Sequence, residues 1–183
     1  MKYFSLIVLF FCFGFSDDPK KLVGNPVPRF SVTSTDSSII DRNFFNSKVS
    51  IITFYSWKCL PCRYEIETLI KLACNHDAKN FSVVIITDDN LKAIQKHFVV
   101  DSSCSRSSSD KKKFSIDPSK IKIVSDTKNS LYTTFGVKPT PTMFIVGRDG
   151  MVREYYLGFP TNPKDKETMF LHLKEKIHSL EFE

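Results

Sequence analysis

The sequence has few of the residue groupings that hold a metal ion. Its 183 residues include four histidines and five cysteines, with one C-x-x-C pair, no second such pair and no H-x-x-x-H motif. A structural zinc site needs four ligands and normally draws them from two close pairs. The sequence therefore disfavours zinc, and neither a metal nor another cofactor is expected.

Long apolar runs, internal repeats and clustered charge are also scarce. The one long apolar run follows Lys2 and is short for a membrane span. The formal net charge of +6 is small and spread along the chain, which argues against a nucleic-acid partner. The length and the apolar content of 42% suit one globular domain with a proper core.

The first 16 residues, MKYFSLIVLFFCFGFS, have the layout of a secretory signal peptide. Lys2 precedes about a dozen apolar residues, and the small residues Gly14 and Ser16 follow, so cleavage after Ser16 is expected. An uncleaved membrane anchor over residues 1–16 is the alternative. We expect a single domain over residues 17–183 of an exported, periplasmic protein, a setting in which thiols tend to be oxidised.

Apolar spacing along the rest of the chain predicts an α/β fold. Continuous β-branched and aromatic runs predict buried strands, and spacing of three to four residues predicts helices with one apolar face. Strands are expected within 29–40, at 49–56, 81–87 and 120–124, and in a hairpin over 142–156; helices are expected after Pro61 and within 88–98, 129–136 and 164–180.

Strands joined through helices pair in parallel, and a hairpin adds antiparallel strands. We therefore expect a mixed central sheet flanked by helices on both faces, preceded by an N-terminal strand pair. The Ser- and Lys-rich stretch at about 99–119 is predicted to form a long loop.

The C-x-x-C pair, Cys59 and Cys62, lies where a buried strand gives way to a helix. Pro61 suits the first helical turn. Cys59 would lie at the helix start, where unpaired N–H groups and the helix dipole stabilise a thiolate, and Lys58 adds a positive charge beside it. Cys62 would lie one turn on and be shielded. This arrangement predicts thiol–disulfide exchange through a mixed disulfide.

A second feature, far away in the sequence, is Pro141 directly before the first strand of the hairpin. An X-Pro bond at such a place is often cis, and an ordinary proline that begins a strand is the alternative.

Together these segments resemble the thioredoxin-fold proteins of the TlpA and ResA type, which are exported thiol–disulfide oxidoreductases. The resemblance is carried by GNPVPRFSVTS, ITFYSWKCLPCRYE and YTTFGVKPTPTMFIVGRDGMV, and it extends from Gly24 to about Leu180. It implies a thioredoxin-like sheet, with Cys59 as the nucleophile and Cys62 as the resolving thiol.

The same resemblance implies that Pro141, with Thr140 before it, packs beside the sulfurs and presents backbone to the substrate. Pro61 and Trp57 belong to the expected active-site support. This chain departs from the family in having Lys58, where a tryptophan usually precedes the first cysteine, and Glu67, where a proline is common.

A disulfide reductase is the activity that we expect. The dipeptide Leu60-Pro61 between the cysteines has no histidine, whereas strong oxidants often hold their thiolate with a polar group there. The resemblance implies that the partners are cysteine-containing exported proteins, such as apocytochrome c or the copper-site subunit of a cytochrome oxidase. It also implies a membrane-embedded thiol reductant that recharges the pair.

Two other functions of the cysteine pair are possible alternatives, and each would need further residues. A copper-binding metallochaperone of the same fold would need a third ligand, usually a histidine after the hairpin strand, and residues 136–160 contain none. A thiol peroxidase would need a P-x-x-x-T/S-x-x-C pattern. Ser56 matches that pattern, but Ile52 stands in the place of its proline.

Cys74 and Cys104 have two interpretations. Both are expected at the end of the domain away from the C-x-x-C pair, where a bridge would tie the stretch 99–119 to the body and add about 2 to 4 kcal/mol. Alternatively, Cys74, four residues after Ile70, is a buried core residue and Cys104 is free.

Overall fold

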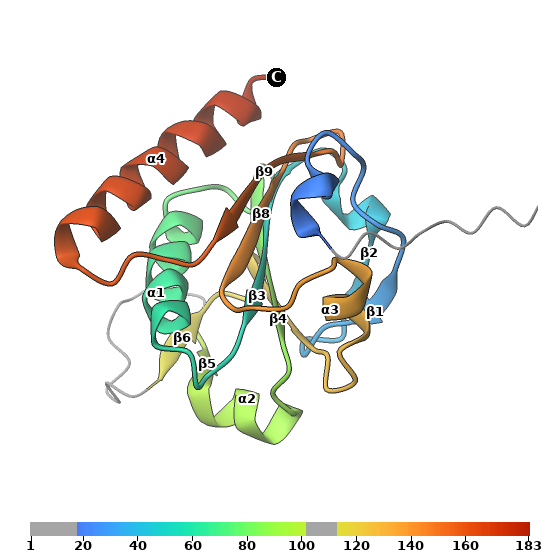
Figure 1. Ribbon diagram of the computed structural model, residues 1–183, viewed down its shortest axis with the longest axis vertical. Helices are drawn as coiled ribbons and strands as arrows, with labels where there is room; N and C mark the ends of the chain where they lie inside the picture. Colours follow the sequence, from blue (N-terminus) through green and yellow to red (C-terminus); the bar gives the residue numbers. More distant parts are fainter. Residues whose placement is uncertain (1–17, 102–112) are drawn as a thin grey trace, which may run out of the picture.

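The computed structural model describes residues 18–101 and 113–183 of the chain. A mixed five-stranded sheet lies at its centre, with the strand order β7-β4-β3-β8-β9 (Figure 1). Strand β3 is parallel to β4, β4 is parallel to β7, and β8 is antiparallel to both of its neighbours. These strands are β3 (Val49–Tyr55), β4 (Phe81–Thr87), β7 (Ile121–Ser125), β8 (Thr142–Val146) and β9 (Val152–Leu157).

Helices cover both faces of this sheet, as the sequence predicted. On one face α1 (Leu60–Cys74) and α4 (Pro163–Glu181) pack against the sheet, together with Ile94 of α2 (Leu91–His97). The other face is covered by α3 (Ser130–Thr134) and by the N-terminal segment.

The central strands are buried along their whole length because both of their faces are covered. In β3 every residue is buried, and successive side chains enter different core clusters. Ile51 and Tyr55 pack on the side of α1, whereas Ile52 and Phe54 pack on the side of α3. The end of β3 is thus fixed from two sides, and α1 begins shortly after it.

The N-terminal segment forms the predicted strand pair, β1 (Ser31–Thr33) with β2 (Ile39–Asp41), between the short 3-10 helices η1 (Pro19–Leu22) and η2 (Arg42–Phe45). Its backbone also reaches both edges of the central sheet.

On β9, the edge strand at one side of the sheet, the N–H of Gly24 donates to the carbonyl oxygen of Val152 at 2.8 Å, and the N–H of Val152 donates to that of Asn25 at 2.9 Å. On β7, the edge strand at the other side, the N–H of Thr35 donates to the carbonyl oxygen of Ile123 at 2.8 Å.

The prediction of a continuous loop at about 99–119 is wrong at the two ends of that stretch. Strands β5 (Phe98–Val100) and β6 (Phe114–Ile116) form a small parallel pair. Phe98 and Ile116 are buried in the core cluster that also contains α1. Burial of these side chains therefore anchors both ends of a stretch whose composition is mostly polar.

The predicted signal peptide at residues 1–16 lies outside the described residues. Within residues 18–101 and 113–183, none of the helices is both long and apolar enough to cross a membrane.

Phe144 offers a test of the core described above. Its ring centroid lies 5.5 to 6.2 Å from those of Phe54, Phe135 and Tyr155, and its side chain is fully buried. We expect Phe144→Ala to lower the free energy of unfolding by about 3 to 5 kcal/mol in urea titrations, because it removes a large buried side chain. The matched control is Phe182→Ala, whose ring is 77% exposed and whose effect should stay within about 0.5 kcal/mol. Equal losses in the two variants would contradict this account of the core.

Candidate active site

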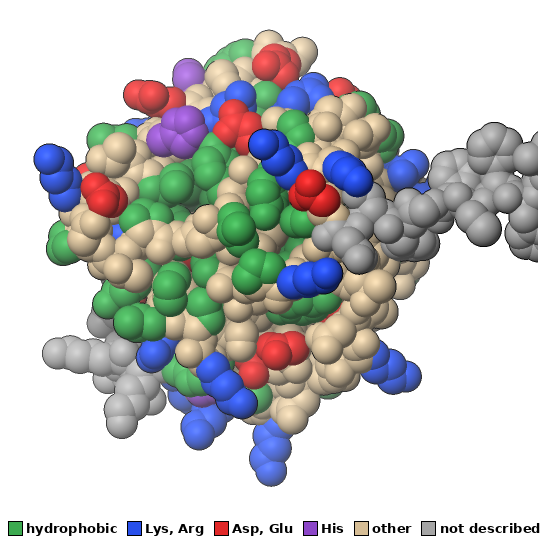
Figure 2. Space-filling model, viewed as in Figure 1, with side chains coloured by type: hydrophobic (Ala, Val, Ile, Leu, Met, Phe, Trp, Pro, Cys, Tyr) green, Lys and Arg blue, Asp and Glu red, His purple; other side chains and the backbone are tan. Residues whose placement is uncertain are grey.

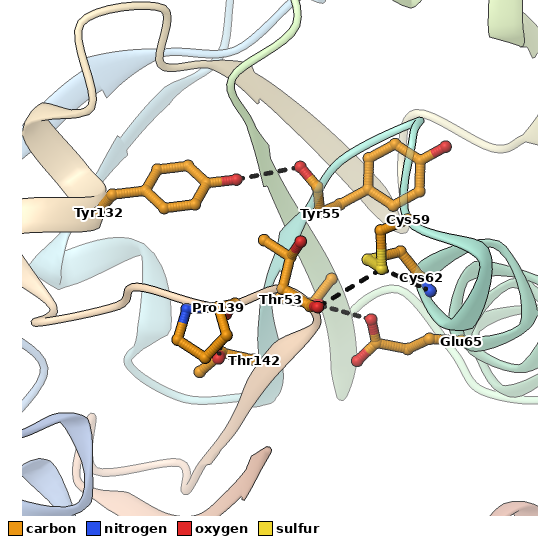
Figure 3. The surroundings of a disulfide bond; sticks show 9 residues. Thr53, Tyr55, Cys59, Cys62, Glu65, Tyr132, Pro139 and Thr142 are labelled. Carbon is orange, nitrogen blue, oxygen red and sulfur yellow. Dashed lines mark hydrogen bonds between the residues drawn. A yellow bond between two sulfur atoms is a disulfide. The ribbon is translucent and has the colours of Figure 1, made fainter. Parts of the chain in front are cut away.

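Cys59 and Cys62 form a disulfide, with Cα atoms 5.3 Å apart (Figure 3). Cys59 is the N-cap residue of α1, and its Sγ atom accepts a hydrogen bond from the backbone N–H of Cys62 at 3.2 Å. Cys59 is partly exposed, whereas Cys62 is fully buried. The geometry therefore gives one sulfur that a partner can reach and one that α1 shields, which is the arrangement that the sequence predicted.

The start of α1 lies at Cys59 for local reasons. Pro61 occupies the first helical turn, where its missing N–H removes no helical hydrogen bond. Cys59 keeps an extended backbone, so its side chain folds over the helix end like the oxygen of a capping serine. Its sulfur thus faces the positive end of the helix dipole, which favours a thiolate at Cys59 after reduction.

A loop from the other half of the chain closes over the pair. The Thr140–Pro141 peptide bond is cis, and the carbonyl oxygen of Thr140 lies 3.4 Å from the Sγ atom of Cys59. The loop is held on both sides, because the Thr142 hydroxyl donates to the carbonyl oxygen of Pro139 at 2.8 Å and the Gly158 N–H donates to that of Pro141 at 2.9 Å. The prediction that this bond is cis and lies beside the cysteines is confirmed.

Glu65 is a site residue that the sequence analysis missed. It lies on α1 three residues after Cys62, so the two side chains share one helix face. The carboxyl group is fully buried, and the hydroxyl group of Thr53 on β3 donates a hydrogen bond to Oε2 at 2.9 Å (Figure 3). Among the described residues, Oε1 has no hydrogen-bond partner. Burial raises the pKa of Glu65 to about 8, although the hydrogen bond from Thr53 acts in the opposite direction. A proton can therefore be held beside Cys62 at neutral pH.

Trp57, two residues before Cys59, is partly buried. Its ring stacks on that of His97 at the end of α2, with centroids 3.4 Å apart and planes 8° apart. The ring of Phe114 on β6 meets it edge-on, with ring centroids 6.0 Å apart, and the guanidinium carbon of Arg63 lies 5.4 Å from the centroid of the Trp57 ring. Burial lowers the pKa of His97. Lys58, next along the chain, is exposed.

The end of β3 is also held from the opposite face of the sheet. The hydroxyl group of Tyr132 on α3 donates to the carbonyl oxygen of Tyr55 at 3.0 Å (Figure 3). Burial is the main cause that raises the pKa of Tyr132, so this hydroxyl keeps its proton. The chain thus leaves β3 toward the cysteines in a fixed direction.

A pocket of about 430 Å³ opens beside Thr140, on the side of α3. Polar side chains dominate its wall, and the loop that precedes Pro141 contributes one side of it. The lining residues are Ser56, Asp88, Asn129, Tyr132, Thr133, Gly136, Val137, Lys138 and Thr140.

Cys74 is the last residue of α1 and is partly buried, at the opposite end of that helix from Cys59. Cys104 lies outside the described residues, so the Cys74–Cys104 bridge stays a prediction. Over the described ranges, no three or more histidine, cysteine, aspartate or glutamate side chains come together in a way that could hold a metal ion.

The sequence is similar to a known protein family and to named thiol-disulfide oxidoreductases. Residues 23–155 match the AhpC/TSA family. The thiol-disulfide oxidoreductase ResA of Bacillus cereus (strain ATCC 10987 / NRS 248) is 25% identical over 153 residues, which cover 84% of this chain and 80% of that protein. ResA of Bacillus anthracis is 25% identical over 161 residues, covering 88% of this chain and 82% of that protein.

Solved structures match over most of the chain as well. A thiol:disulfide interchange protein of the thioredoxin family from Chlorobium tepidum TLS aligns with a TM-score of 0.59 and 16% identity, over 85% of this chain and 95% of that one. StoA from Bacillus subtilis aligns with a TM-score of 0.53 and 17% identity, over 80% and 97% of the two chains. The fold is therefore thioredoxin-like, as the sequence resemblance implied.

The raised pKa of Glu65 predicts a pH-dependent stability. Between its ordinary pKa of 4.5 and the folded value of about 8, the folded state keeps a proton that the unfolded state has lost. The free energy of unfolding of the oxidised protein should therefore fall, on the order of a few kcal/mol, as the pH rises through this window. Below pH 4.5 both the folded and the unfolded state hold this proton, so Glu65 no longer makes the free energy of unfolding depend on pH.

Glu65→Gln, which cannot ionise, should remove that fall in urea titrations at about pH 5 and about pH 8. Glu67→Gln, an exposed position on the same helix, is the control and should behave like the unchanged protein. A Glu65→Gln variant with the same pH dependence as the unchanged protein would show that another group is responsible.

Proposed function

We propose that this chain, which belongs to the AhpC/TSA family, is a thiol–disulfide oxidoreductase that reduces disulfides in exported partner proteins. The observation that carries this proposal is the Cys59–Cys62 bridge at the start of α1, with the Thr140 carbonyl oxygen beside the reachable sulfur. The names of its relatives, among them the thiol-disulfide oxidoreductase ResA, support the same reaction.

The reaction consists of two exchanges. The Cys59 thiolate attacks one sulfur of a partner disulfide, forms a mixed disulfide and releases the other partner sulfur as a thiolate, which takes up a proton. The Cys62 thiolate then attacks the Cys59 sulfur and releases the first partner sulfur, which also takes up a proton. Two electrons pass to the partner, and the Cys59–Cys62 bridge seen in the structure is the product on this side.

Glu65 suits the second exchange, in which Cys62 must lose a proton although it is buried. The carboxyl group lies on the same face of α1 as Cys62, and its pKa of about 8 is close to that of an ordinary thiol. The ionised carboxyl group can accept the Cys62 proton without a large cost, and Thr53 holds it in place.

The partner segment is expected to lie along the loop that contains Thr140 and Pro141. The Thr140 carbonyl oxygen is next to Cys59, and the pocket beside Thr140 can receive a neighbouring side chain of the partner. We therefore assign the backbone at Thr140 and Pro141 and the exposed side chain of Lys58 to partner contact, and Trp57 and Pro61 to support of the cysteine turn.

The proposed direction is reduction, because Leu60 and Pro61 place no polar side chain between the cysteines. Outside the cytoplasm the pair would then need a membrane-embedded thiol reductant to recharge it. Maturation of cytochrome c or of a cytochrome oxidase subunit is the process that the sequence resemblance favours, with secretion or anchoring through residues 1–16.

A trap tests the activity and identifies partners. The reduced protein should cleave a model peptide disulfide, and Cys59→Ser should abolish this because the attacking sulfur is lost. Cys62→Ser should instead accumulate a mixed disulfide through Cys59, visible by mass spectrometry as one added peptide per chain. If Cys62→Ser turns over like the unchanged protein, the two-step mechanism is wrong. Reduction of peroxide in place of the peptide, or tight copper binding by the reduced pair, would favour the peroxidase or metallochaperone alternatives.

The position of Cys59 predicts an acidic thiol. The start of α1 and the adjacent Lys58 should lower the Cys59 pKa well below the value of about 8.5 of a free cysteine. The rate of alkylation by iodoacetamide against pH measures this midpoint, with Cys62→Ser used to isolate Cys59. Lys58→Ala should move the midpoint upward; a midpoint near that of free cysteine would mean that the helix start does not activate Cys59.

A further inference from the structure

The packing of the Trp57 side chain determines which residues are exposed next to Cys59. This side chain is the only tryptophan of the chain, and it is enclosed by His97 on one face, Phe114 at its edge and Arg63 nearby. It is therefore partly buried and offers only part of its surface to a partner that approaches Cys59. The exposed neighbours of Cys59 in the chain are instead Lys58 and Leu60.

Basic side chains continue outward from Lys58. Arg63, on the first turns of α1, lies against the Trp57 ring. Lys92 and Lys96 are exposed and four residues apart on α2, so they share one helix face, next to the His97 that stacks on Trp57. We call Lys58, Arg63, Lys92 and Lys96 the basic rim.

Figure 2 shows basic side chains gathered at the lower end of the molecule, where Figure 1 places α2.

Among the described residues, acidic side chains near the basic rim are fewer, and two of the three are engaged within the domain. Asp88 and Asp89 follow β4 at this end of the sheet. The Asp89 carboxylate accepts a hydrogen bond from the Thr87 hydroxyl at 3.1 Å. Asp126, also near this end, is buried and accepts hydrogen bonds from the first N–H groups of α3. Within residues 18–101 and 113–183, the four cations of the basic rim outnumber Asp88 and Asp89, so the charge that these residues present near Cys59 is positive on balance.

We infer that this oxidoreductase selects partner proteins in which acidic residues flank the reactive cysteine. The inference rests on the proposed disulfide exchange and names the class of partner for it. A basic rim beside the attacking sulfur attracts a partner of opposite charge and repels one of like charge. Such steering raises association rates by about 10-fold or more at low ionic strength and is screened by salt.

Three peptides of equal length test this inference. Each contains the same disulfide, flanked by glutamate, by glutamine or by lysine. The second-order rate constant for reduction of each peptide by the reduced protein can be followed through the fluorescence of Trp57, which lies two residues before Cys59. At about 0.01 M salt we expect the glutamate peptide to react about 10-fold faster than the lysine peptide, with the glutamine peptide between them. At about 1 M salt, where the Debye length is about 3 Å, the three rates should converge.

Charge reversal away from the catalytic residues locates the effect. Lys92→Glu/Lys96→Glu should remove or invert the preference for the glutamate peptide and leave the rate with the glutamine peptide unchanged. The matched control, Lys79→Glu/Lys174→Glu, changes the net charge equally at exposed positions away from the basic rim and should keep the preference. Equal effects of the two double variants would mean that net charge, and not the basic rim, is responsible.

The outcomes separate this inference from the proposed function. Equal rates with all three peptides at low salt would overturn the selection of acidic partners and leave disulfide exchange intact. Failure to reduce any of the peptides, at low or high salt, would instead contradict the proposed function itself.

Discussion

The hydrogen bond from the Cys62 N–H to the Cys59 sulfur is the constraint on which the active end of this protein depends. It makes Cys59 the cap of α1, and this one role decides several properties together. The sulfur stays at the helix end, where the dipole favours its anion, and the second cysteine is carried one turn inward into the core. A cysteine one position earlier or later would lose either the cap or the shielding of its partner.

The sheet brings the second half of the site to this cap. Strand β8 lies beside β3, with Thr142 opposite Phe54, so the loop before β8 must arrive where β3 ends. Thr140 and Cys59 are therefore neighbours although they are 81 residues apart in the sequence. Tyr132 holds the β3 end from the other face. The contact between sulfur and carbonyl oxygen thus rests on strand register, which a buried core fixes firmly.

Much of this could be predicted from the sequence, because the responsible signals are local. The continuous apolar runs of β3 and β4 and the strand-to-helix junction at Cys59 are visible without a structure. Glu65 could also have been found from the sequence, because it falls on the helix face of Cys62 and Leu69, where a charged residue is unusual. The spacing of apolar residues alone does not identify it.

The features that were missed depend on contacts between distant segments. Strands β5 and β6 have three residues each, too few to show a period, and each is recognisable only beside the other. The stacking of Trp57 on His97 likewise joins the cysteine turn to the end of α2, and no local sequence pattern predicts this contact.

The N-terminal segment has a consequence for how the molecule meets other chains. Its backbone bonds to Val152 on one edge strand and to Ile123 on the other, so a single stretch of chain occupies part of both borders of the sheet. Unpaired strand borders invite strands from other molecules, which leads to aggregation. Loss of the segment from Gly24 to Thr35 would open both borders at once. By occupying these positions, the segment therefore protects both edges of the sheet from pairing with strands of other molecules.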